Sequence, residues 1–264
     1  MRSVDVLRTL ADITAYQWGM VTAGQASMAG VSRLDLSRLA QSGHLNRLAH
    51  GVYMDAGVPS SPLDDLRAAW LSTDPRILGA ARLSEPAAGV VVAASSAAAL
   101  HGIGDLWAQR HEFISPTRRQ SQRQNIRYRT RTLDAQDVTV VEGLPVMTLE
   151  RTITDLVEEV GDLSLVSDAL REAAKQRELD LDRLTQLLAP LAHQHGFATA
   201  DGAALLERLQ QDAGIDPDTL ARQIAQSPSL GRRTTSAYLA GLNESEARRL
   251  LGTLRPEPGK ASHD

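Results

Sequence analysis

Residues 21–54 read VTAGQASMAGVSRLDLSRLAQSGHLNRLAHGVYM and decide the N-terminal fold. Thr22 and Gln25 form a capping-box pattern, which predicts a short helix over residues 23–29. A glycine turn follows, and a second capping pattern directly after it predicts another helix over residues 31–42. Two short helices joined by a glycine-containing turn are the signature of a helix-turn-helix.

The flanking sequence adds the remaining parts of this domain. Apolar residues recur at helical spacing over residues 4–15, which predicts a first helix. Two short strands are predicted over residues 44–48 and 51–54, and together they form a β-hairpin. We therefore expect a winged helix-turn-helix over residues 1–58.

The helix over residues 31–42 has two different faces at about 100° per residue. Leu36, Leu39 and Ala40 share one face, and polar residues with Leu34 occupy the other. Arginine can bridge guanine, glutamine can pair with adenine, and leucine can touch a thymine methyl group. We interpret this segment as a recognition helix in a DNA major groove; the alternative is a three-helix subdomain with a solvated polar face.

The predicted DNA contacts come from the two caps, the recognition helix and the wing. They are Thr22, Ser32, Arg33, Leu34, Ser37, Arg38, Gln41, Arg47 and His50. The wing residues would contact phosphates, which position a protein on DNA without specifying sequence.

Charge is unevenly distributed along the chain. The net charge of −4 argues against a protein that coats nucleic acid along its whole length. Residues 115–132 nevertheless contain six arginines and no acidic residue, whereas residues 150–182 are rich in Asp and Glu. The six are Arg118, Arg119, Arg123, Arg127, Arg129 and Arg131.

Strand alternation places the last three of these arginines on one face of a strand over residues 125–132. This basic face would extend the DNA footprint, or bind RNA or an acidic partner. The alternative is a strand edge that its charge keeps solvated.

The rest of the chain predicts an α+β fold that is mostly helical. A turn-rich linker over residues 59–62 precedes an α+β domain over residues 63–190. Its predicted helices cover 63–71, an Ala-rich segment capped by Ser95 or Ser96, 149–160, 163–177 and 181–188, and its strands cover 89–94, 111–115, 125–132 and 138–141. Thr148 and Asp180 are the expected caps of the helices at 149–160 and 181–188, and Asp216 is the expected cap of a later helix at 217–226. A helical extension over residues 196–255 follows, with helices at 201–211, 217–226, 233–240 and 244–251, and residues 256–264 form a disordered tail.

Enzyme chemistry finds little support. The chain has no cysteine, which excludes disulfides and thiolate sites, and His193 and His195 have no nearby carboxylate to complete a metal site. The sequence lacks a phosphate-cradling glycine loop and a nucleophile elbow. We expect a non-enzymatic protein without cofactor or metal. Without a signal peptide or a membrane-spanning run, we also expect it to be soluble and cytoplasmic, with no membrane partner.

Three segments carry a family resemblance. They are the wing ending in Gly51-Val52-Tyr53, the Ser-Ala-Ala-x-Leu-His-Gly segment at residues 96–102, and GLPV at residues 143–146 followed by Glu150-Arg151-Thr152. Across roughly residues 15–190 the chain resembles the AbiEi family of antitoxins. The resemblance implies a phage-defence system in which the N-terminal domain represses its own promoter at inverted repeats of double-stranded DNA. It also implies a C-terminal domain that neutralises a nucleotidyltransferase-like toxin, directly or indirectly.

Two alternatives stay open at this stage. One is a solitary winged-helix transcriptional regulator whose C-terminal part senses a ligand or dimerises. The other is an antitoxin that binds its toxin through the acidic helices of residues 149–188 or through the C-terminal helices.

Overall fold

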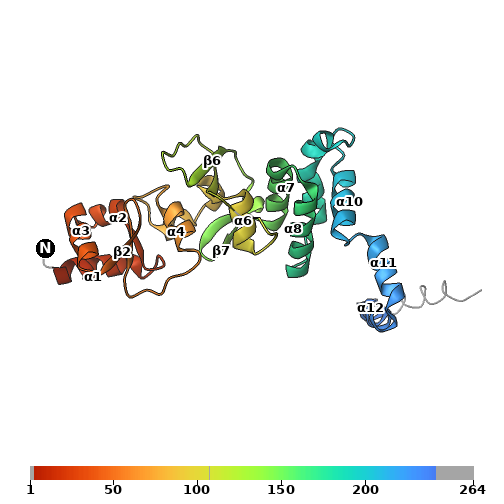
Figure 1. The fold of residues 1–264 in the computed structure, drawn as a ribbon, viewed down its shortest axis with the longest axis horizontal. Helices are drawn as coiled ribbons and strands as arrows, with labels where there is room; N and C mark the ends of the chain where they lie inside the picture. Colours follow the sequence, from red (N-terminus) through yellow and green to blue (C-terminus); the bar gives the residue numbers. More distant parts are fainter. Residues whose placement is uncertain (1–2, 107, 242–264) are drawn as a thin grey trace, which may run out of the picture. The chain divides into compact units, whose positions relative to one another are not determined.

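The computed structural model describes residues 3–106 and 108–241. The chain divides into two compact units, Met1–Ala213 and Gly214–Asp264. Helices predominate and strands are short, so the prediction of a mostly helical α+β fold is confirmed (Figure 1). The predicted helix 244–251 and the predicted tail 256–264 lie outside the described residues.

The N-terminal part of the first unit is a winged helix-turn-helix. Its elements are α1 (Ser3–Thr14), β1 (Met20–Thr22), α2 (Ala23–Met28), α3 (Arg33–Gln41), β2 (Leu45–Ala49) and β3 (Val52–Asp55). The strands form an antiparallel sheet of order β1-β3-β2. Strand β1 was not predicted, because its three residues are all buried and therefore show no alternation of polar and apolar residues.

Both predicted helix caps are present. The Thr22 hydroxyl accepts a hydrogen bond from the Gln25 amide at 3.1 Å, and the Ser32 hydroxyl accepts one from the Asp35 amide at 3.1 Å. These caps satisfy amides that have no partner within the helix, and they fix where α2 and α3 begin.

The predicted two-sided character of α3 is also present. Leu36 and Leu39 are buried in a core that receives Val6 and Leu10 from α1 and Tyr53 from β3. Packing of this leucine face holds α3 in place and turns its polar face outward.

A mixed five-stranded sheet forms the centre of the first unit. Its strands are β4 (Val91–Val92), β5 (His111–Ser115), β6 (Ile126–Thr130), β7 (Val138–Val141) and β8 (Leu144–Met147), in the order β6-β5-β4-β8-β7. The helical turns around it are α4 (Asp64–Leu71), α5 (Gly79–Arg82), η1 (Pro86–Ala88), α6 (Ala94–His101) and η2 (Ala135–Asp137). The predicted strand 89–94 is thus only two residues long.

Strand β8 is the second strand that was not predicted. It pairs with β7 through a two-residue turn in which Glu142 and Gly143 both have positive φ. A β-carbon on Gly143 would lie 2.8 Å from the ring of Trp18, so this position needs glycine. The segment contains Pro145 and therefore did not predict a strand, because proline is rare in paired strands.

The predicted cap of the Ala-rich helix is wrong. Helix α6 begins at Ala94, and the side chains of Ser95 and Ser96 do not cap it. Instead, the Asp155 carboxylate accepts a hydrogen bond from the Ala94 amide at 3.0 Å, and the Glu112 carboxylate accepts one from the Ser95 amide at 3.1 Å. The two anions come from other elements, so the local sequence could not reveal them.

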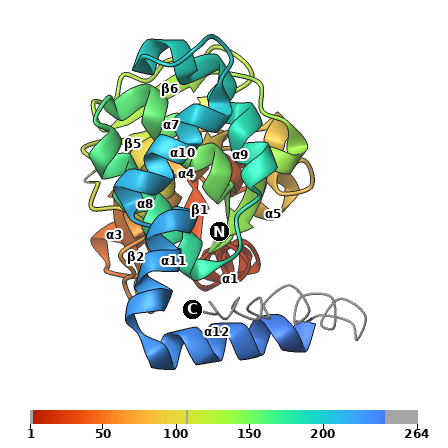
Figure 2. The same ribbon diagram turned by 90° about the vertical axis from the view of Figure 1, so that its right-hand side faces the viewer.

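Helices complete the first unit after the sheet. They are α7 (Leu149–Val160), α8 (Leu163–Gln176), α9 (Leu181–Leu188), η3 (Ala189–His195) and α10 (Gly202–Ala213). Helix α7 packs on α6, α8 and α9, and α10 packs on α8 and α9 (Figure 2). The predicted caps Thr148 and Asp180 are present at α7 and α9.

The winged helix shares a hydrophobic core with the part of the chain that follows it. Met20 and Met54 pack with Trp70, Leu71 and Phe113 in one buried cluster. The predicted domain boundaries stay predictions, but a cut at residues 59–62 would divide this core.

A buried polar network crosses the same junction. Gln17 and Gln25 exchange amide hydrogen bonds of 2.8 and 3.1 Å. Gln17 also accepts from the Gly79 amide at 2.8 Å, and Gln25 donates to the Ile77 carbonyl at 2.9 Å. Removal of the hydrogen-bond partner of a buried amide group destabilises the folded state. This network therefore joins the winged helix firmly to the segment after α4.

The second compact unit contains α11 (Pro217–Gln226) and α12 (Pro228–Gly241). Asp216 caps α11, as predicted, and the predicted helix 233–240 is the later part of α12. Among the described residues, none of the helices is long and apolar enough to cross a membrane.

Candidate nucleic-acid interface

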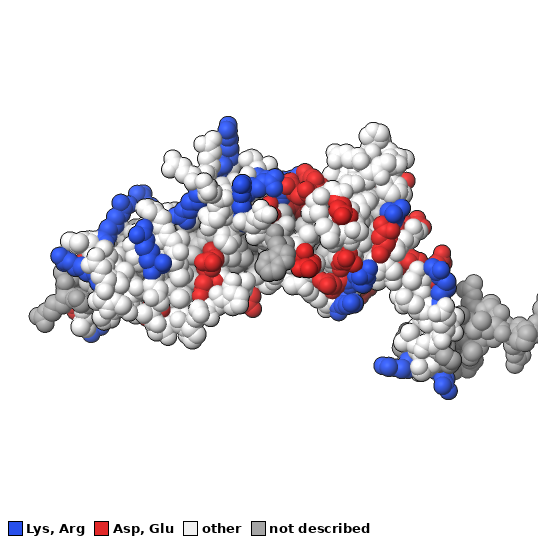
Figure 3. All heavy atoms as spheres, in the orientation of Figure 1, with Lys and Arg blue, Asp and Glu red and all other residues white. Residues whose placement is uncertain are grey.

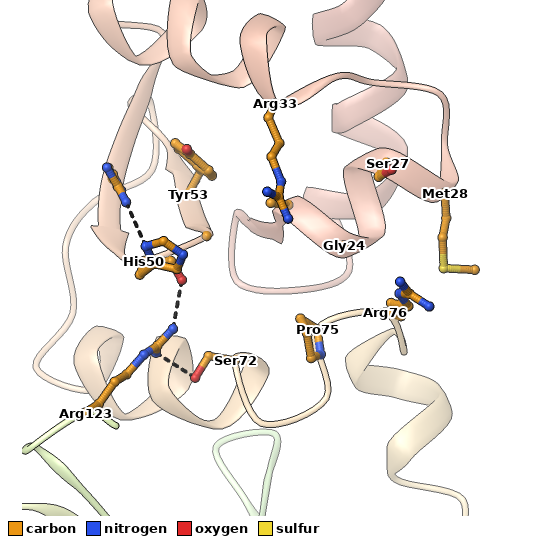
Figure 4. A pocket seen from close by; sticks show the side chains of 13 residues that line it. Gly24, Ser27, Met28, Arg33, His50, Tyr53, Ser72, Pro75, Arg76 and Arg123 are labelled. Carbon is orange, nitrogen blue, oxygen red and sulfur yellow. Dashed lines mark hydrogen bonds between the residues drawn. The ribbon is translucent and has the colours of Figure 1, made fainter. Parts of the chain in front are cut away.

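A groove of about 760 Å³ lies beside α3, the predicted recognition helix (Figure 4). We call it the basic groove. It is lined by Ala23, Gly24, Ser27, Met28, Arg33, Arg47, His50, Gly51, Tyr53, Ser72, Pro75, Arg76 and Arg123. The groove therefore joins α2, α3 and the wing to the end of α4, the segment after it, and the loop between β5 and β6.

The lining carries strong positive charge. It contains four arginines and a histidine, and none of its described residues is Asp or Glu. On the face shown in Figure 3, most Lys and Arg of the first unit lie over α1–α4 and β6, and most Asp and Glu lie over α7–α10. A concave surface lined by one sign of charge concentrates ions of the opposite sign, so this groove attracts anions.

The predicted reading face of α3 is exposed. Arg33, Leu34, Ser37, Arg38 and Gln41 all face solvent, and Leu34 is 57% exposed. An exposed leucine among polar groups is available for contact with a base methyl group. Exposure alone does not test DNA binding, so these contacts stay a prediction.

The two capping residues differ in their availability. Thr22 is fully buried and its hydroxyl lies against the Pro75 carbonyl, so its assignment as a DNA contact is corrected: it is a structural cap. Ser32 is exposed, but its hydroxyl bonds to the Asp35 carboxylate at 2.6 Å.

The two predicted wing residues lie together at the groove. The guanidinium of Arg47 approaches Nδ1 of His50 at 3.3 Å, and both side chains are exposed. The wing thus places Arg47 in the same groove as Arg33 of α3, and the predicted phosphate contacts of the two wing residues stay a prediction.

Arg76 was missed by sequence analysis. It is exposed and follows Pro75, whose carbonyl meets the Thr22 hydroxyl. A β-carbon on Gly24 would collide with that same carbonyl, so glycine permits this close approach. A single arginine in a loop gives no signal in the sequence, and only the tertiary contact brings it to the groove.

The predicted basic face of β6 is not a free basic surface. Arg127 pairs with Glu112 and Glu159, at 3.1 and 2.7 Å. Arg129 pairs with Asp155, and with Glu159 at 3.0 Å. The strand alternation was right, but the acidic helix α7 covers the arginine face and neutralises much of its charge.

Arg131 completes this ion-pair cluster. Its guanidinium contacts Asp155 at 3.4 Å and Glu158 at 2.6 Å. Arg151 of α7 lies 3.8 Å from both carboxylates. Asp155 is fully buried at the centre of the cluster, so its anion stabilises the fold rather than facing a ligand.

The other three arginines of the run differ from one another. Arg119 makes a two-pronged contact with Asp74, at 2.9 and 3.2 Å, which also neutralises it. Arg123 reaches the basic groove. Arg118 is exposed and, within the described part of the chain, makes no ion pair or hydrogen bond.

The pH dependence of stability should reveal the cluster. Hydrogen bonds from Arg131 hold the pKa of Glu158 below its ordinary value of 4.5. A carboxylate with a lowered pKa stabilises the folded state above the unfolded pKa, and this contribution is lost as the pH falls through the folded pKa. We expect Glu158→Gln to lower the unfolding free energy by less than about 1 kcal/mol at neutral pH, because the pair is partly exposed. Urea unfolding of both proteins should show the difference shrinking as the pH falls below 4.5; a constant difference would contradict this assignment.

The described residues contain no group of three or more His, Asp or Glu that could hold a metal ion. His101 is structural: its Nε2 bonds to the Met147 carbonyl at 2.6 Å, and burial lowers its pKa. It links α6 to the end of β8.

Two protein-family models match the chain. Residues 8–54 match a model described as "Transcriptional regulator, AbiEi antitoxin", and residues 87–207 match the "AbiEi antitoxin C-terminal domain". No curated protein matches. A similar solved structure is the RV2827C protein from Mycobacterium tuberculosis, with a TM-score of 0.50 and 18% identity over 81% of this chain and 78% of that one. That likeness supports the fold alone.

The two family matches agree with the order of parts in the structure. The first covers the winged helix as far as Met54, and the second covers the five-stranded sheet and the helices α7–α9. The chain therefore belongs to the AbiEi antitoxin family, as a member with a transcriptional-regulator domain followed by the antitoxin C-terminal domain.

Proposed function

We propose that this protein is a non-enzymatic antitoxin that represses its own operon by binding promoter DNA through the basic groove. The observation that carries this proposal is that Arg33, on the exposed face of α3, and Arg47, on the wing, line one positively charged groove. Cationic side chains bind phosphates by releasing counterions, whereas exposed side chains on a recognition helix can reach base edges. The family descriptions support both roles, regulator and antitoxin.

Roles within the site follow from position. Arg33 and Arg38 lie on the exposed face of α3 and are assigned to bases. Arg47 and Arg76 both line the groove and are assigned to phosphates. The proposed operator is an inverted repeat in double-stranded DNA.

The test is a mobility-shift titration on DNA from upstream of the gene. We expect Arg33→Ala and Arg38→Ala each to weaken binding by about 1–3 kcal/mol and to relax sequence preference. Affinity of the unchanged protein should fall steeply as salt rises. Arg208→Ala is the matched control, because Arg208 is an exposed arginine on α10 that does not line the groove.

Two results would contradict the assignment. Unchanged DNA binding by a variant that carries both Arg33→Ala and Arg38→Ala would show that α3 is not the reading helix. Equal affinity for upstream DNA and for unrelated DNA would remove promoter repression.

The proposed antitoxin role concerns a nucleotidyltransferase-like toxin in the cytoplasm. Cells that express such a toxin should grow again when this protein is co-expressed. Co-purification of the two proteins would show whether neutralisation is direct. Failure to restore growth would contradict the antitoxin role without affecting the DNA result.

A further inference from the structure

We propose that Arg123 is a positioning residue for the wing, so that the loop between β5 and β6 completes the DNA-binding groove. This rests on the proposed function for its DNA readout. It also applies to the protein without DNA, because it states what holds the wing tip in place, residues 50 and 51 between β2 and β3.

Arg123 bridges two segments that are distant in the sequence. One guanidinium nitrogen donates to the Ser72 hydroxyl at 2.8 Å, and the other donates to the His50 carbonyl at 2.8 Å. Ser72 lies at the end of α4, and its hydroxyl donates to the Ala69 carbonyl at 2.6 Å. The Ser72 hydroxyl that accepts from Arg123 is thus fixed in orientation. Because the guanidinium is planar, its second hydrogen bond then fixes the wing tip relative to α4.

The wing tip needs such a support. The pairing of β2 with β3 shifts register between Arg47 and Ala49, so the regular ladder is interrupted before the last pair, Ala49 and Val52, beside the tip. Beyond the shift, the Gly51 carbonyl accepts from the Ala23 amide at 2.8 Å, which holds one side of the tip. Arg123 holds the other side through His50, whose ring contacts Arg47. Moving the tip would therefore move the cation that the wing presents to DNA.

The fork geometry distinguishes this role from a simple phosphate contact. A lysine carries the same charge but a single ammonium group, which cannot reproduce the two diverging hydrogen bonds of a guanidinium. If Arg123 only attracted phosphate, lysine would largely replace it. If Arg123 positions the wing, Arg123→Lys should behave like Arg123→Gln.

The experiment compares Arg123→Lys and Arg123→Gln with Arg118→Gln in the full-length protein. Arg118 is the matched control, because it lies in the same loop, is exposed and does not line the groove. We expect amide hydrogen exchange at residues 48–52 to become roughly tenfold faster in both Arg123 variants and to stay unchanged in Arg118→Gln. We also expect both Arg123 variants to bind upstream DNA roughly tenfold more weakly.

Each outcome decides the proposal. Exchange and affinity at the wild-type level in Arg123→Lys would overturn it and leave a phosphate contact. If amide exchange is also faster in Arg118→Gln, the effect comes from changing the loop in general, and the proposal for Arg123 is overturned. If the wild-type protein does not bind DNA, the proposed function fails, but the exchange data still test whether Arg123 holds the wing.

Discussion

Asp155→Asn is expected to destabilise the first compact unit by about 3–5 kcal/mol. The Asp155 carboxylate is fully buried, and it accepts from Arg129, Arg131 and the Ala94 amide. Asparagine fills a similar volume but carries no charge, so it would leave partly buried guanidinium groups without their central anion. Removal of one partner from a buried ion pair is costly because the remaining charge has already lost its water. Urea unfolding followed by circular dichroism measures the change.

The control is Glu158→Gln at the outer end of the same cluster. Glu158 is exposed, and its interaction with Arg131 competes with water, so the same chemical change should cost less than about 1 kcal/mol. Equal effects at both positions would show that burial does not decide the strength of this cluster. Near-wild-type stability of Asp155→Asn would show that the cluster adds nothing to the fold.

Local signals in the sequence predicted local structure well. The caps at Thr22, Ser32, Thr148 and Asp180 all begin helices where they were expected. A capping side chain bonds to an amide two or three residues away, so the sequence contains the complete interaction. The exposed face of α3 followed from helical periodicity for the same reason.

Long-range pairing was not predictable from these signals. The arginines of β6 and the acids of α7 were both visible as charge runs, but nothing in their spacing showed that they face each other. Arg129 and Asp155 are 26 positions apart in sequence, and the turn and strand β8 between them determine how they meet. The basic run was therefore interpreted as either a surface for a partner or a solvated strand edge, whereas it is largely neutralised within the fold.

The candidate site shows the same division. Arg33 and Arg47 could be named as candidate DNA contacts from a motif, since a recognition helix and a wing have known positions relative to DNA. Arg76 and Arg123 could not, because they reach the groove only through contacts that join the winged helix to the rest of the unit. The electrostatics of the groove are thus a property of the tertiary structure.

A fragment of residues 63–264 is expected not to fold on its own. Removing the first 62 residues would expose the face of Trp70 and Leu71 that packs against Met20, Val52 and Met54. Each large buried apolar side chain contributes about 1.5–3 kcal/mol, and the net stability of a domain is only about 5–15 kcal/mol. The cut would also remove Gln17 and Gln25, so the buried Gly79 amide would lose its hydrogen-bond acceptor. Thermal and urea unfolding of the purified fragment should show no cooperative transition.

The matched control is a fragment that ends at Ala213, where the first compact unit ends. It keeps the shared core and the glutamine network, so it should unfold cooperatively with a midpoint close to that of the full chain. A cooperative transition in residues 63–264 would show that the shared core is dispensable and that the winged helix is an independent domain. If instead only the fragment ending at Ala213 folds, the proposed DNA binding and the proposed toxin neutralisation cannot be separated by a cut at residues 59–62, and point variants such as Arg33→Ala are needed to separate them.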